Sequence, residues 1–406
     1  MQPDPVSWHL RTMHKRGILL TAGILVAAGV IFYAADMPHL PPPYATKAVS
    51  NPPRVIPEPS GAKLQVPPGF HMEIWAEGFA RPRFMLLGPS HEIILADAAP
   101  RPRGTVYVFP PNSRERKKLI EGLYQPYGLA ILDGYLYVAE SDSVKRYKYD
   151  SKAMTAGPGQ EIISLEGIDQ HHWTRSLLFD RAGKKLYVGV GSGSNSSPGE
   201  DPRRAAINRY NVDGTGHEIF GAGLRNPIGM RWYPGTDTLW AAVQERDDLG
   251  DDLVPDYLTH VQQGGFYGWP YAYIGPHEDP TNKGLAPDLV AKTLVPDVLL
   301  GSHVAVLDFL FYTGKQFPAE YQGGAFLAFH GSWNRSQRVG YSVAFVPFKD
   351  AQPSGPVREV VTGWMLSPDQ QQVWGRPVGL LEMPDGSLLI SEDGNKRIWR
   401  LSYTGK

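Results

Sequence analysis

The chain repeats one short phrase with variations, and this repetition constrains its fold more than any other feature. A clear copy runs over 225–243, where Arg-Asn-Pro-Ile-Gly is followed by an apolar stretch, a Pro-Gly turn and a second apolar stretch. Further copies start at Gln125 and at Arg376. Each copy has the pattern of two short strands joined by a tight turn. Because the phrase recurs about every 40 to 50 residues with no helical pattern between copies, the sequence predicts a β-propeller.

Three weaker copies, which start at Arg81, His172 and His303, bring the expected number of blades to six. The positions next to the turns are, in chain order, Phe84, Gly128, Ser176, Gly229, Asp308 and Gly379. Their spacings are 44, 48, 53, 79 and 71 residues, and the first three each suit one four-stranded blade. The two long spacings indicate insertions at about 245–300 and about 335–373, which in repeat folds usually lie on the binding face. A seven-bladed propeller and a β-sandwich are the alternatives.

The composition narrows the chemistry that the chain can perform. It has 406 residues and a net charge of −1, so it lacks the basic surface of nucleic-acid-binding proteins, and we expect no nucleic-acid partner. It contains no cysteine, which excludes disulfides, thiolate-bound zinc, iron–sulfur clusters and a Cys-x-x-Cys-His haem site. Redox chemistry therefore requires a bound organic cofactor, or a metal held by oxygen or nitrogen.

The N-terminal region is predicted to anchor the chain in a membrane. Residues 17–35 are uncharged and largely apolar, and as a helix they would rise about 28 Å, close to the hydrocarbon thickness of a bilayer. Basic residues precede this stretch at Arg11, Lys15 and Arg16, so the positive-inside rule places the propeller on the periplasmic, extracytoplasmic side. A cleaved signal peptide is the alternative, although an aromatic residue stands three positions before both candidate cleavage points.

A Pro-rich stretch follows the predicted anchor, and we expect it to be an extended, semi-rigid tether without a core of its own. The predicted parts are a cytoplasmic N-terminus, a transmembrane anchor, a Pro-rich linker and a six-bladed propeller, over 1–16, 17–35, 36–66 and 67–406.

Two residues at the starts of neighbouring repeats are candidates for catalysis. His172 and Arg225 occupy equivalent positions in successive copies, and equivalent positions in different blades point at the same central channel. Histidine is the side chain best suited to act as a general base near neutral pH. The alternative is that His172 only forms a hydrogen bond with a backbone carbonyl group.

The stretch 244–256 is rich in carboxylates and is broken by Gly and Pro, which suits an oxygen-ligated cation such as Ca²⁺. Its aspartates are Asp247, Asp248, Asp251, Asp252 and Asp256. The spacing does not fit an EF-hand loop, and a solvated acidic turn is the alternative. The Gly-rich stretch 264–270 neither follows a strand nor opens a helix, so we expect a tight turn packed by Tyr267 and Trp269.

A third group of residues is suited to an anionic ligand. The stretch 330–335 brings His, Trp, Asn and Arg together at the end of an expected strand, and burying so many polar groups requires partners or a ligand. Arg335 and Arg376, together with Arg225, could bind carboxylates because the planar guanidinium group donates two parallel hydrogen bonds. Exposure of these residues at the surface is the alternative.

Taken together and in this order, six stretches make the chain similar to the glucose/sorbosone dehydrogenase family, in particular its sorbosone-dehydrogenase-like branch and the soluble aldose sugar dehydrogenases. The stretches are 172–179, 224–229, 245–257, 265–270, 330–335 and 375–379. The resemblance covers about 67–406. It implies a six-bladed propeller that binds pyrroloquinoline quinone (PQQ) and Ca²⁺ and oxidises an aldose or a sugar aldehyde.

The resemblance also implies roles for individual residues. His172 matches the general base, Arg225 matches an arginine that contacts the quinone oxygen, and Asn226 lies beside it. Further cofactor contacts are implied for His303, His330, Trp333, Arg335 and Arg376. Metal binding is implied for Glu245 and Arg246 through their main-chain carbonyl groups, in an acidic stretch that also contains Asp247, Asp251 and Asp252.

The chain has no haem motif, so the electrons must pass to a partner, either ubiquinone or a cytochrome. A membrane anchor would suit such a transfer. Two other functions remain open: a Ca²⁺-dependent lactonase or esterase on the same fold, and a propeller without catalytic activity that binds a partner or a glycan.

Overall fold

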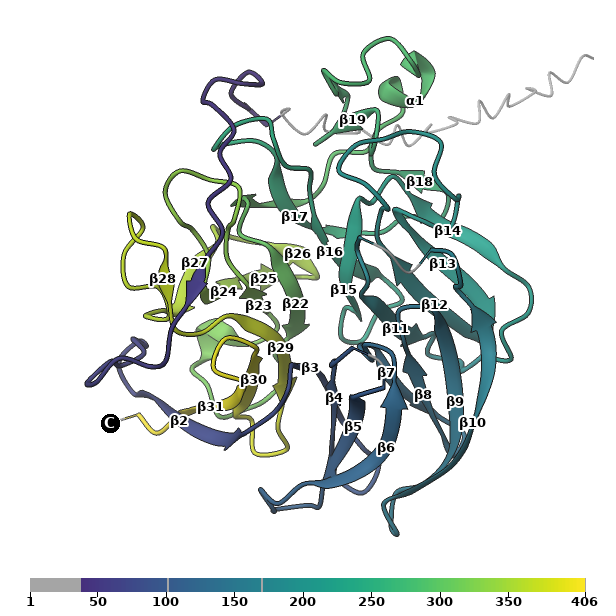
Figure 1. Cartoon of the computed structure of the whole chain (residues 1–406), viewed down its shortest axis with the longest axis vertical. Coiled ribbons are helices and arrows are strands. Elements are labelled where there is room, and N and C mark those ends of the chain that lie inside the picture. Colours follow the sequence, from purple (N-terminus) through teal and green to yellow (C-terminus); the bar gives the residue numbers. More distant parts are fainter. Residues whose placement is uncertain (1–37, 101, 169–170, 406) are drawn as a thin grey trace, which may run out of the picture. The chain divides into compact units, whose positions relative to one another are not determined.

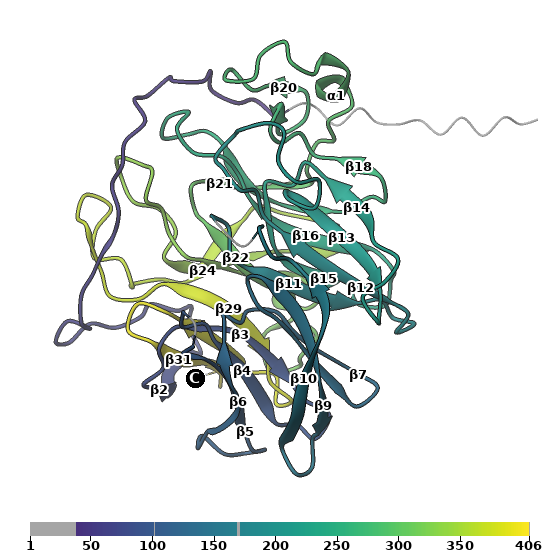
Figure 2. The same ribbon diagram turned by 45° about the vertical axis from the view of Figure 1, so that its right-hand side comes forward.

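The computed structural model describes residues 38–100, 102–168 and 171–405. Within these residues, six sheets of four or five strands are arranged as the blades of a β-propeller (Figure 1). The innermost strands of consecutive blades contact one another and form a ring around the axis. Figures 1 and 2 both show these strands gathered toward the middle of the molecule. The prediction of an all-β, six-bladed propeller is therefore confirmed.

In the first five blades the strands follow chain order from the axis outward. The first two blades consist of β3 (Pro82–Leu87), β4 (Ile93–Asp97), β5 (Gly104–Phe109) and β6 (Lys117–Leu123), then β7 (Leu129–Leu132), β8 (Tyr135–Ala139), β9 (Ser143–Asp150) and β10 (Thr155–Ser164). The third consists of β11 (Arg175–Phe179), β12 (Lys185–Val190), β13 (Ala206–Asn211) and β14 (Glu218–Ala222), and β18 (Gly265–Phe266) pairs in parallel with β14 as its fifth strand. The fourth consists of β15 (Asn226–Trp232), β16 (Leu239–Gln244), β17 (Pro255–His260) and β21 (Val298–Ser302). The fifth consists of β22 (Val306–Phe311), β23 (Ala325–Phe329), β24 (Ser342–Val346) and β27 (Arg358–Val361).

The sixth blade joins the two ends of the propeller. Its inner strands come from the C-terminal part of the chain: β29 (Pro377–Glu382), β30 (Leu388–Glu392) and β31 (Arg397–Tyr403). Its outer strand is β2 (Phe70–Glu77), which pairs antiparallel with β31. Backbone hydrogen bonds between the first and last strands of the ring therefore close the propeller.

Packing between blades explains why the strand sequences are apolar on both faces. Every residue of β4 and of β23 is buried, because each blade is covered by a neighbour on either side. Large aromatic side chains fill the spaces between blades, and Trp240, Trp364 and Trp374 are at most 1% exposed. Exposed residues are instead found in outer strands such as β10, where only Ile163 is buried.

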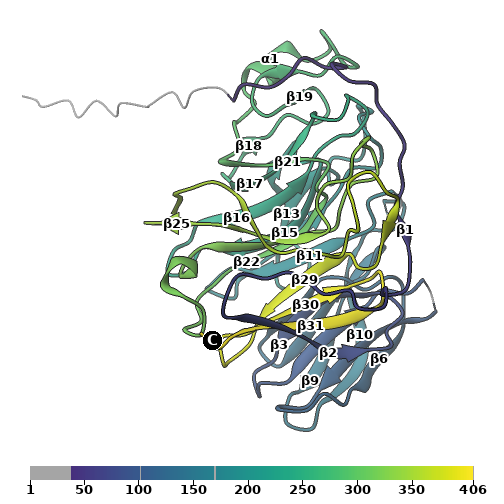
Figure 3. The same ribbon diagram turned by 90° about the vertical axis from the view of Figure 1, so that its left-hand side faces the viewer.

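Residues 38–66, here called the strap, pack along the surface of the propeller. The strap contributes β1 (Arg54–Val55), which is labelled in Figure 3 and pairs in parallel with β28 (Gln372–Val373). Hydrogen bonds join the Tyr44 amide to the Leu249 carbonyl and the Asn51 amide to the Trp333 carbonyl. Apolar strap side chains pack against two core clusters: Leu40, Ile56, Ala62, Leu64 and Val66. The predicted semi-rigid tether over 36–66 stays a prediction, and the part of it that the structure describes, the strap, contributes to the packing of the propeller.

The two long repeat spacings correspond to inserted structure. The first insertion lies between β17 and β21 and contains β18 (Gly265–Phe266), β19 (Ala272–Tyr273), β20 (His277–Glu278) and the helix α1 (Pro287–Ala291). The second insertion region contains the hairpin of β25 (Phe348–Lys349) and β26 (Gln352–Pro353) and the strand β28. A 3₁₀ turn, η1 (Ala319–Tyr321), precedes β23.

The predicted membrane anchor, 17–35, and the cytoplasmic N-terminus before it lie outside the described residues. Among the residues from 38 onward that the structure describes, no helix is long and apolar enough to span a bilayer.

Candidate active site

Two adjoining cavities lie at the end of the axis where the inner strands begin, here called the mouth. The large mouth cavity measures about 240 Å³ and the small one about 70 Å³. The residues that line both are His172, Gln244, Ala305 and Trp333. The other polar residues of the large cavity are Arg81, Arg83, His171, Thr174, Asn226, His330 and Arg376, with Trp173 beside them. Those of the small cavity are Arg225, Glu245, Asp247, Asp256 and His303. The fold thus brings together most of the residues that the sequence singled out.

His172 is held in the protonation state that a general base requires. Its Nδ1 atom lies 3.0 Å from the carbonyl oxygen of Ser192 and 3.0 Å from the Ser192 hydroxyl oxygen. Because a carbonyl oxygen only accepts hydrogen bonds, Nδ1 carries the proton, and the lone pair is on Nε2. Burial, followed by the charge of Arg225, holds the pKa of His172 well below its usual value. The imidazole is therefore neutral at neutral pH.

A glycine lets the backbone approach His172 closely. A Cβ atom at Gly191 would lie 2.6 Å from the Cβ of His172 and 2.2 Å from the Oδ1 of Asn226. Any larger residue at this position would therefore displace one of these two side chains.

Arg225 precedes β15 and is fixed by groups from two blades. Its Nε donates to the Asn195 carbonyl oxygen at 3.1 Å, and its Nη1 donates to the Glu245 carbonyl oxygen at 2.5 Å. Its Nη2 donates to the Asn195 side chain at 3.0 Å and lies 3.4 Å from Asp247. Trp269 in the first insertion also donates to the Asn195 carbonyl oxygen. The stretch 264–270 was predicted to be a tight turn that follows no strand, but it comes after β17 and contains the short strand β18. Tyr267 and Trp269 are buried as expected, and Trp269 supports the residues that orient Arg225.

The first blade contributes two arginines that sequence reasoning missed as site residues. Arg81 and Arg83 lie with their guanidinium groups 4.8 and 5.1 Å from the ring of Trp173. Arg83 donates to Asp393 at 2.7 Å, while its buried Nε has no hydrogen-bond partner. The sequence repeat could have identified these two arginines, because Arg81 and Arg83 stand at the start of one repeat, just as Arg376 stands at the start of another.

The positive charges in the large mouth cavity exceed the negative ones. Arg81, Arg83 and Arg376 all face one carboxylate, Asp393, whose pKa is lowered by Arg83 and His330 against the effect of burial. Burial and the neighbouring Arg83 lower the pKa of Arg81 to about 10, so its guanidinium still carries its charge at neutral pH. The cavity is therefore suited to a ligand with more than one negative charge.

His330 and Trp333 lie on the loop after β23. The Nε2 of His330 lies 2.9 Å from Asp393, and burial together with Arg376 lowers its pKa to about 3, so the ring is neutral. The His330 carbonyl oxygen accepts a hydrogen bond from Arg376 at 3.3 Å. Trp333 is 43% exposed at the mouth and lines both cavities. Its indole ring therefore offers an apolar surface to a ligand that binds in either cavity.

The small mouth cavity is surrounded by acidic groups. Burial raises the pKa of Glu245 to about 8, and its Oε1 atom is buried without a partner. Asp256, which accepts a hydrogen bond from the Glu245 amide at 2.9 Å, has a pKa raised by burial to about 6. Both ring nitrogens of His303 have a partner: Nδ1 lies 3.3 Å from Asp247, and Nε2 lies 2.9 Å from the Gly250 carbonyl oxygen. Burial lowers the pKa of His303, but these two hydrogen bonds raise it more, so the pKa lies above its usual value.

Four of the predicted site residues have other partners. Arg335 donates to the Asp251 carbonyl oxygen and to Asp252, and none of these three residues lines either mouth cavity. The Ser336 amide donates to the Asp251 side chain at 2.9 Å, which makes this acidic loop an anchor for the 330–338 loop. The Arg246 side chain is buried and donates to Asp279 at 2.7 Å. Among the described residues, no group of three or more histidine and acidic side chains is arranged to hold a metal ion.

These features agree with the comparisons to known proteins. The family model described as TrAA12-like matches residues 64–265 and 288–404. The chain belongs to the TrAA12-like family. A PQQ-dependent sugar dehydrogenase from Hypocrea jecorina is 25% identical, with 83% of this chain and 88% of that protein covered. A PQQ-dependent pyranose dehydrogenase from Coprinopsis cinerea is 24% identical over 65% of this chain and 44% of its own length.

Solved structures from the same group share the fold of this TrAA12-like chain. The holo form of the pyranose dehydrogenase PQQ domain from Coprinopsis cinerea superposes with a TM-score of 0.72 at 20% identity, and the match covers 85% of this chain and 98% of that domain. The family match and the PQQ-dependent relatives therefore confirm the resemblance to quinoprotein sugar dehydrogenases, while the place of this chain in the sorbosone-dehydrogenase-like branch stays a prediction.

Proposed function

We propose that this chain is a PQQ-dependent dehydrogenase that oxidises an aldose or a related sugar aldehyde at the mouth of the propeller. The observation that carries the proposal is the excess of guanidinium charge, from Arg81, Arg83 and Arg376, beside a neutral histidine base, His172. The PQQ-dependent relatives in the same family support it.

The residues of the large mouth cavity fit the cofactor. PQQ is a planar molecule with three carboxylates, and guanidinium groups bind planar carboxylates through paired hydrogen bonds. The unpartnered Nε of Arg83 and the unpartnered Oδ1 of Asn226 are buried polar atoms that a ligand would satisfy. Trp333 and Trp173 provide flat apolar surfaces against a ring system. We therefore assign Arg81, Arg83, Arg376 and Asn226 to cofactor binding.

PQQ, when bound, supplies the acceptor for the hydride that leaves the anomeric carbon of the sugar. His172 takes the proton of the anomeric hydroxyl group on its Nε2 atom, because its Nδ1 proton is already donated to Ser192. Since His172 is neutral over the physiological range, no prior deprotonation is needed. Arg225 is fixed at the adjoining cavity, where its charge stabilises an oxyanion that develops during the reaction.

We further propose that Ca²⁺ binds at the small mouth cavity. Of the predicted metal ligands, Glu245 and Asp247 line this cavity together with Asp256, and Ca²⁺ prefers oxygen donors of this kind. These three side chains are not arranged as a metal site in the structure, so they would have to turn toward the ion on binding. The unpartnered Oε1 of Glu245 is the acceptor that a cation would satisfy first. Asp251 and Asp252, which the sequence placed in the same site, have the other partners described above. Arg246 was predicted to bind the ion through its main-chain carbonyl group, and its side chain pairs with Asp279.

The membrane anchor at 17–35, the periplasmic location and the transfer of electrons to ubiquinone or a cytochrome remain part of the proposal. A protein fixed at the membrane surface would meet an acceptor that is itself membrane-bound.

The proposed function is tested with protein purified without PQQ. PQQ and Ca²⁺ are added separately and together, and reduction of ferricyanide is followed over a panel of aldoses and sugar aldehydes. We expect sugar-dependent reduction only when PQQ is present, and we expect a calcium chelator to lower the melting temperature of the loaded protein. Absence of saturable PQQ binding would refute the proposal and favour a lactonase or a non-catalytic binding protein.

A further inference from the structure

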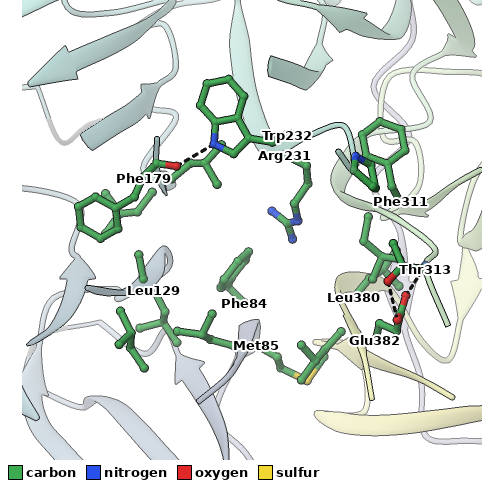
Figure 4. A pocket seen from close by; sticks show the side chains of 18 residues that line it. Phe84, Met85, Leu129, Phe179, Arg231, Trp232, Phe311, Thr313, Leu380 and Glu382 are labelled. Carbon is green, nitrogen blue, oxygen red and sulfur yellow. Dashed lines mark hydrogen bonds between the residues drawn. The ribbon is translucent and has the colours of Figure 1, made fainter. Parts of the chain in front are cut away.

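A second axial cavity lies at the opposite end of the ring of inner strands and is here called the far cavity. It measures about 470 Å³, within the range of small-molecule sites, and every blade contributes residues to its wall. Figure 4 shows its labelled residues Phe84, Leu129, Phe179, Trp232, Phe311 and Leu380 surrounding the open space. The wall is therefore mostly apolar and aromatic, in contrast to the mouth.

The polar groups of the far cavity are already paired, with one exception. Arg231 reaches into the middle of the cavity in Figure 4 and forms an ion pair with the buried Asp308 at 2.9 Å. At the rim, Glu382 accepts hydrogen bonds from the amide and the hydroxyl group of Thr313, at 2.7 and 2.9 Å. The Nη1 of Arg231 donates to the Met230 carbonyl oxygen and its Nη2 donates to Asp308, which leaves the Nε hydrogen and the second Nη1 hydrogen available to a ligand. A matching ligand is neutral and apolar and carries an oxygen acceptor.

The shape of the wall favours a flat ring. The Arg231 guanidinium lies 5.1 Å from the Phe84 ring centroid, so this side of the cavity is planar and aromatic. Trp232 is fixed in place by a hydrogen bond from its Nε1 to the Phe179 carbonyl oxygen at 2.7 Å. Rigid aromatic walls bind planar rings with little loss of conformational entropy.

Aromatic side chains connect the far cavity with the mouth. Trp173 lines the large mouth cavity, Tyr127 is buried behind it with ring centroids 6.3 Å apart, and Phe84 of the far cavity follows at 6.2 Å. The two cavities are also close along the strand, because Ile228 lines one and Arg231 lines the other, three residues or about 10 Å apart. Electrons released at the mouth therefore have a short route to the far cavity.

We propose that the far cavity binds a neutral quinone as the electron acceptor of the enzyme, an inference that rests on the proposed function. Oxidation of a sugar hemiacetal to its lactone releases two electrons and two protons. The quinone takes the two electrons from the cofactor site along Trp173, Tyr127 and Phe84, and it takes two protons from water at the open end of the cavity to become a hydroquinone. The two protons of the sugar leave at the mouth. The sugar and its acceptor thus occupy opposite ends of the axis.

The binding test uses the full chain without PQQ and duroquinone as the probe, because its fully substituted ring does not react with amines. Equilibrium dialysis should show saturable binding of one duroquinone per chain. Two variants narrow the cavity, Leu178→Trp in its wall and Thr313→Trp at its exposed rim, and each should weaken binding at least tenfold. Leu366→Trp, at a residue that is 45% exposed and lies outside the far cavity, is the matched control and should bind as the wild type does. Absence of saturable binding, or equal binding by all variants, would overturn the proposal.

The kinetic test separates this proposal from the function on which it rests. Ferricyanide is an anion suited to the arginine-rich mouth, so its sugar-dependent reduction by the wild-type holoenzyme tests the dehydrogenase alone. The ratio of duroquinone reduction to ferricyanide reduction should fall at least tenfold in Thr313→Trp and stay constant in Leu366→Trp. Excess sugar should not compete with duroquinone. Competition between the two, with ferricyanide reduction intact, would place the acceptor at the mouth and refute the far-cavity site while leaving the dehydrogenase in place.

Discussion

Replacement of His172 by alanine tests the catalytic assignment most directly. The variant loses the Nε2 lone pair that takes the anomeric proton, while the arginines of the large mouth cavity remain. A general base contributes about 10²- to 10⁴-fold to a rate. The pKa of His172 lies well below the usual value of 6.5, and a weaker base contributes toward the lower part of that range. We therefore expect kcat/KM to fall about 10²- to 10³-fold, or about 3–4 kcal/mol of transition-state stabilisation.

The assay is sugar-dependent ferricyanide reduction at saturating PQQ, with PQQ binding measured in parallel by equilibrium dialysis. The PQQ dissociation constant of His172→Ala should stay close to that of the wild type. Ser192→Ala is the matched control, because it removes the hydroxyl group near Nδ1 but keeps the carbonyl group that fixes the tautomer, and it should retain most of its activity.

The pH dependence provides an independent check on the same residue. The reaction needs the neutral imidazole, which is the form present above the pKa. Because burial and Arg225 depress that pKa, kcat/KM should reach its plateau already below pH 6.5 and fall only at more acidic pH. Full activity in His172→Ala, or an acid limb that this substitution leaves in place, would refute the assignment of His172 as the base.

Four further predictions concern other parts of the molecule. Arg83→Gln should raise the PQQ dissociation constant about 10- to 100-fold, because it removes charge-assisted hydrogen bonds worth about 1.5–3 kcal/mol, and equilibrium dialysis measures this. Gly191→Ala should lower kcat while the protein stays folded, since its Cβ would meet His172; wild-type kcat would contradict the close contact. Asn51→Ala should destabilise the protein by about 1–2 kcal/mol in denaturant unfolding, because its side chain hydrogen-bonds both the 330–338 loop and residue 371, and proteolysis of the strap should accelerate. Tyr127→Leu should slow duroquinone reduction at least tenfold relative to Tyr127→Phe, which keeps the ring between the two cavities.

The number of blades and the position of the mouth could be read from the sequence because each repeat begins in the same way. Residues at equivalent repeat positions, such as His172, Arg225 and Arg376, do meet around the mouth. The same logic would have found Arg81 and Arg83, which begin a weaker copy of the phrase.

Residues outside the repeat register could not be placed in this way. Asp251 lies on the loop between β16 and β17, and Arg335 lies on the loop between β23 and β24. These loops bind each other, so the partners of both residues depend on how the loops fold rather than on a shared repeat position. Asn195 accepts two hydrogen bonds from Arg225, and Asp256 accepts one from the Glu245 amide, but neither composition nor spacing predicts these contacts. The sequence also did not predict that the strap packs against the propeller. A Pro-rich sequence predicts an extended backbone but not the surface on which that backbone lies.

The pairing of β2 with β31 has a consequence for how the molecule is made. Phe70 pairs with Tyr403, so the contact that completes the ring joins residues more than 300 positions apart. During synthesis the N-terminal strand must wait until almost the whole chain has left the ribosome, and contacts of such long sequence separation form slowly. Throughout that interval the first blade has an uncovered apolar face and β2 has no partner strand, and both features make a nascent chain prone to aggregate. A chain that stops before residue 397 would remain in that open state, because the strand that should receive β2 would be missing.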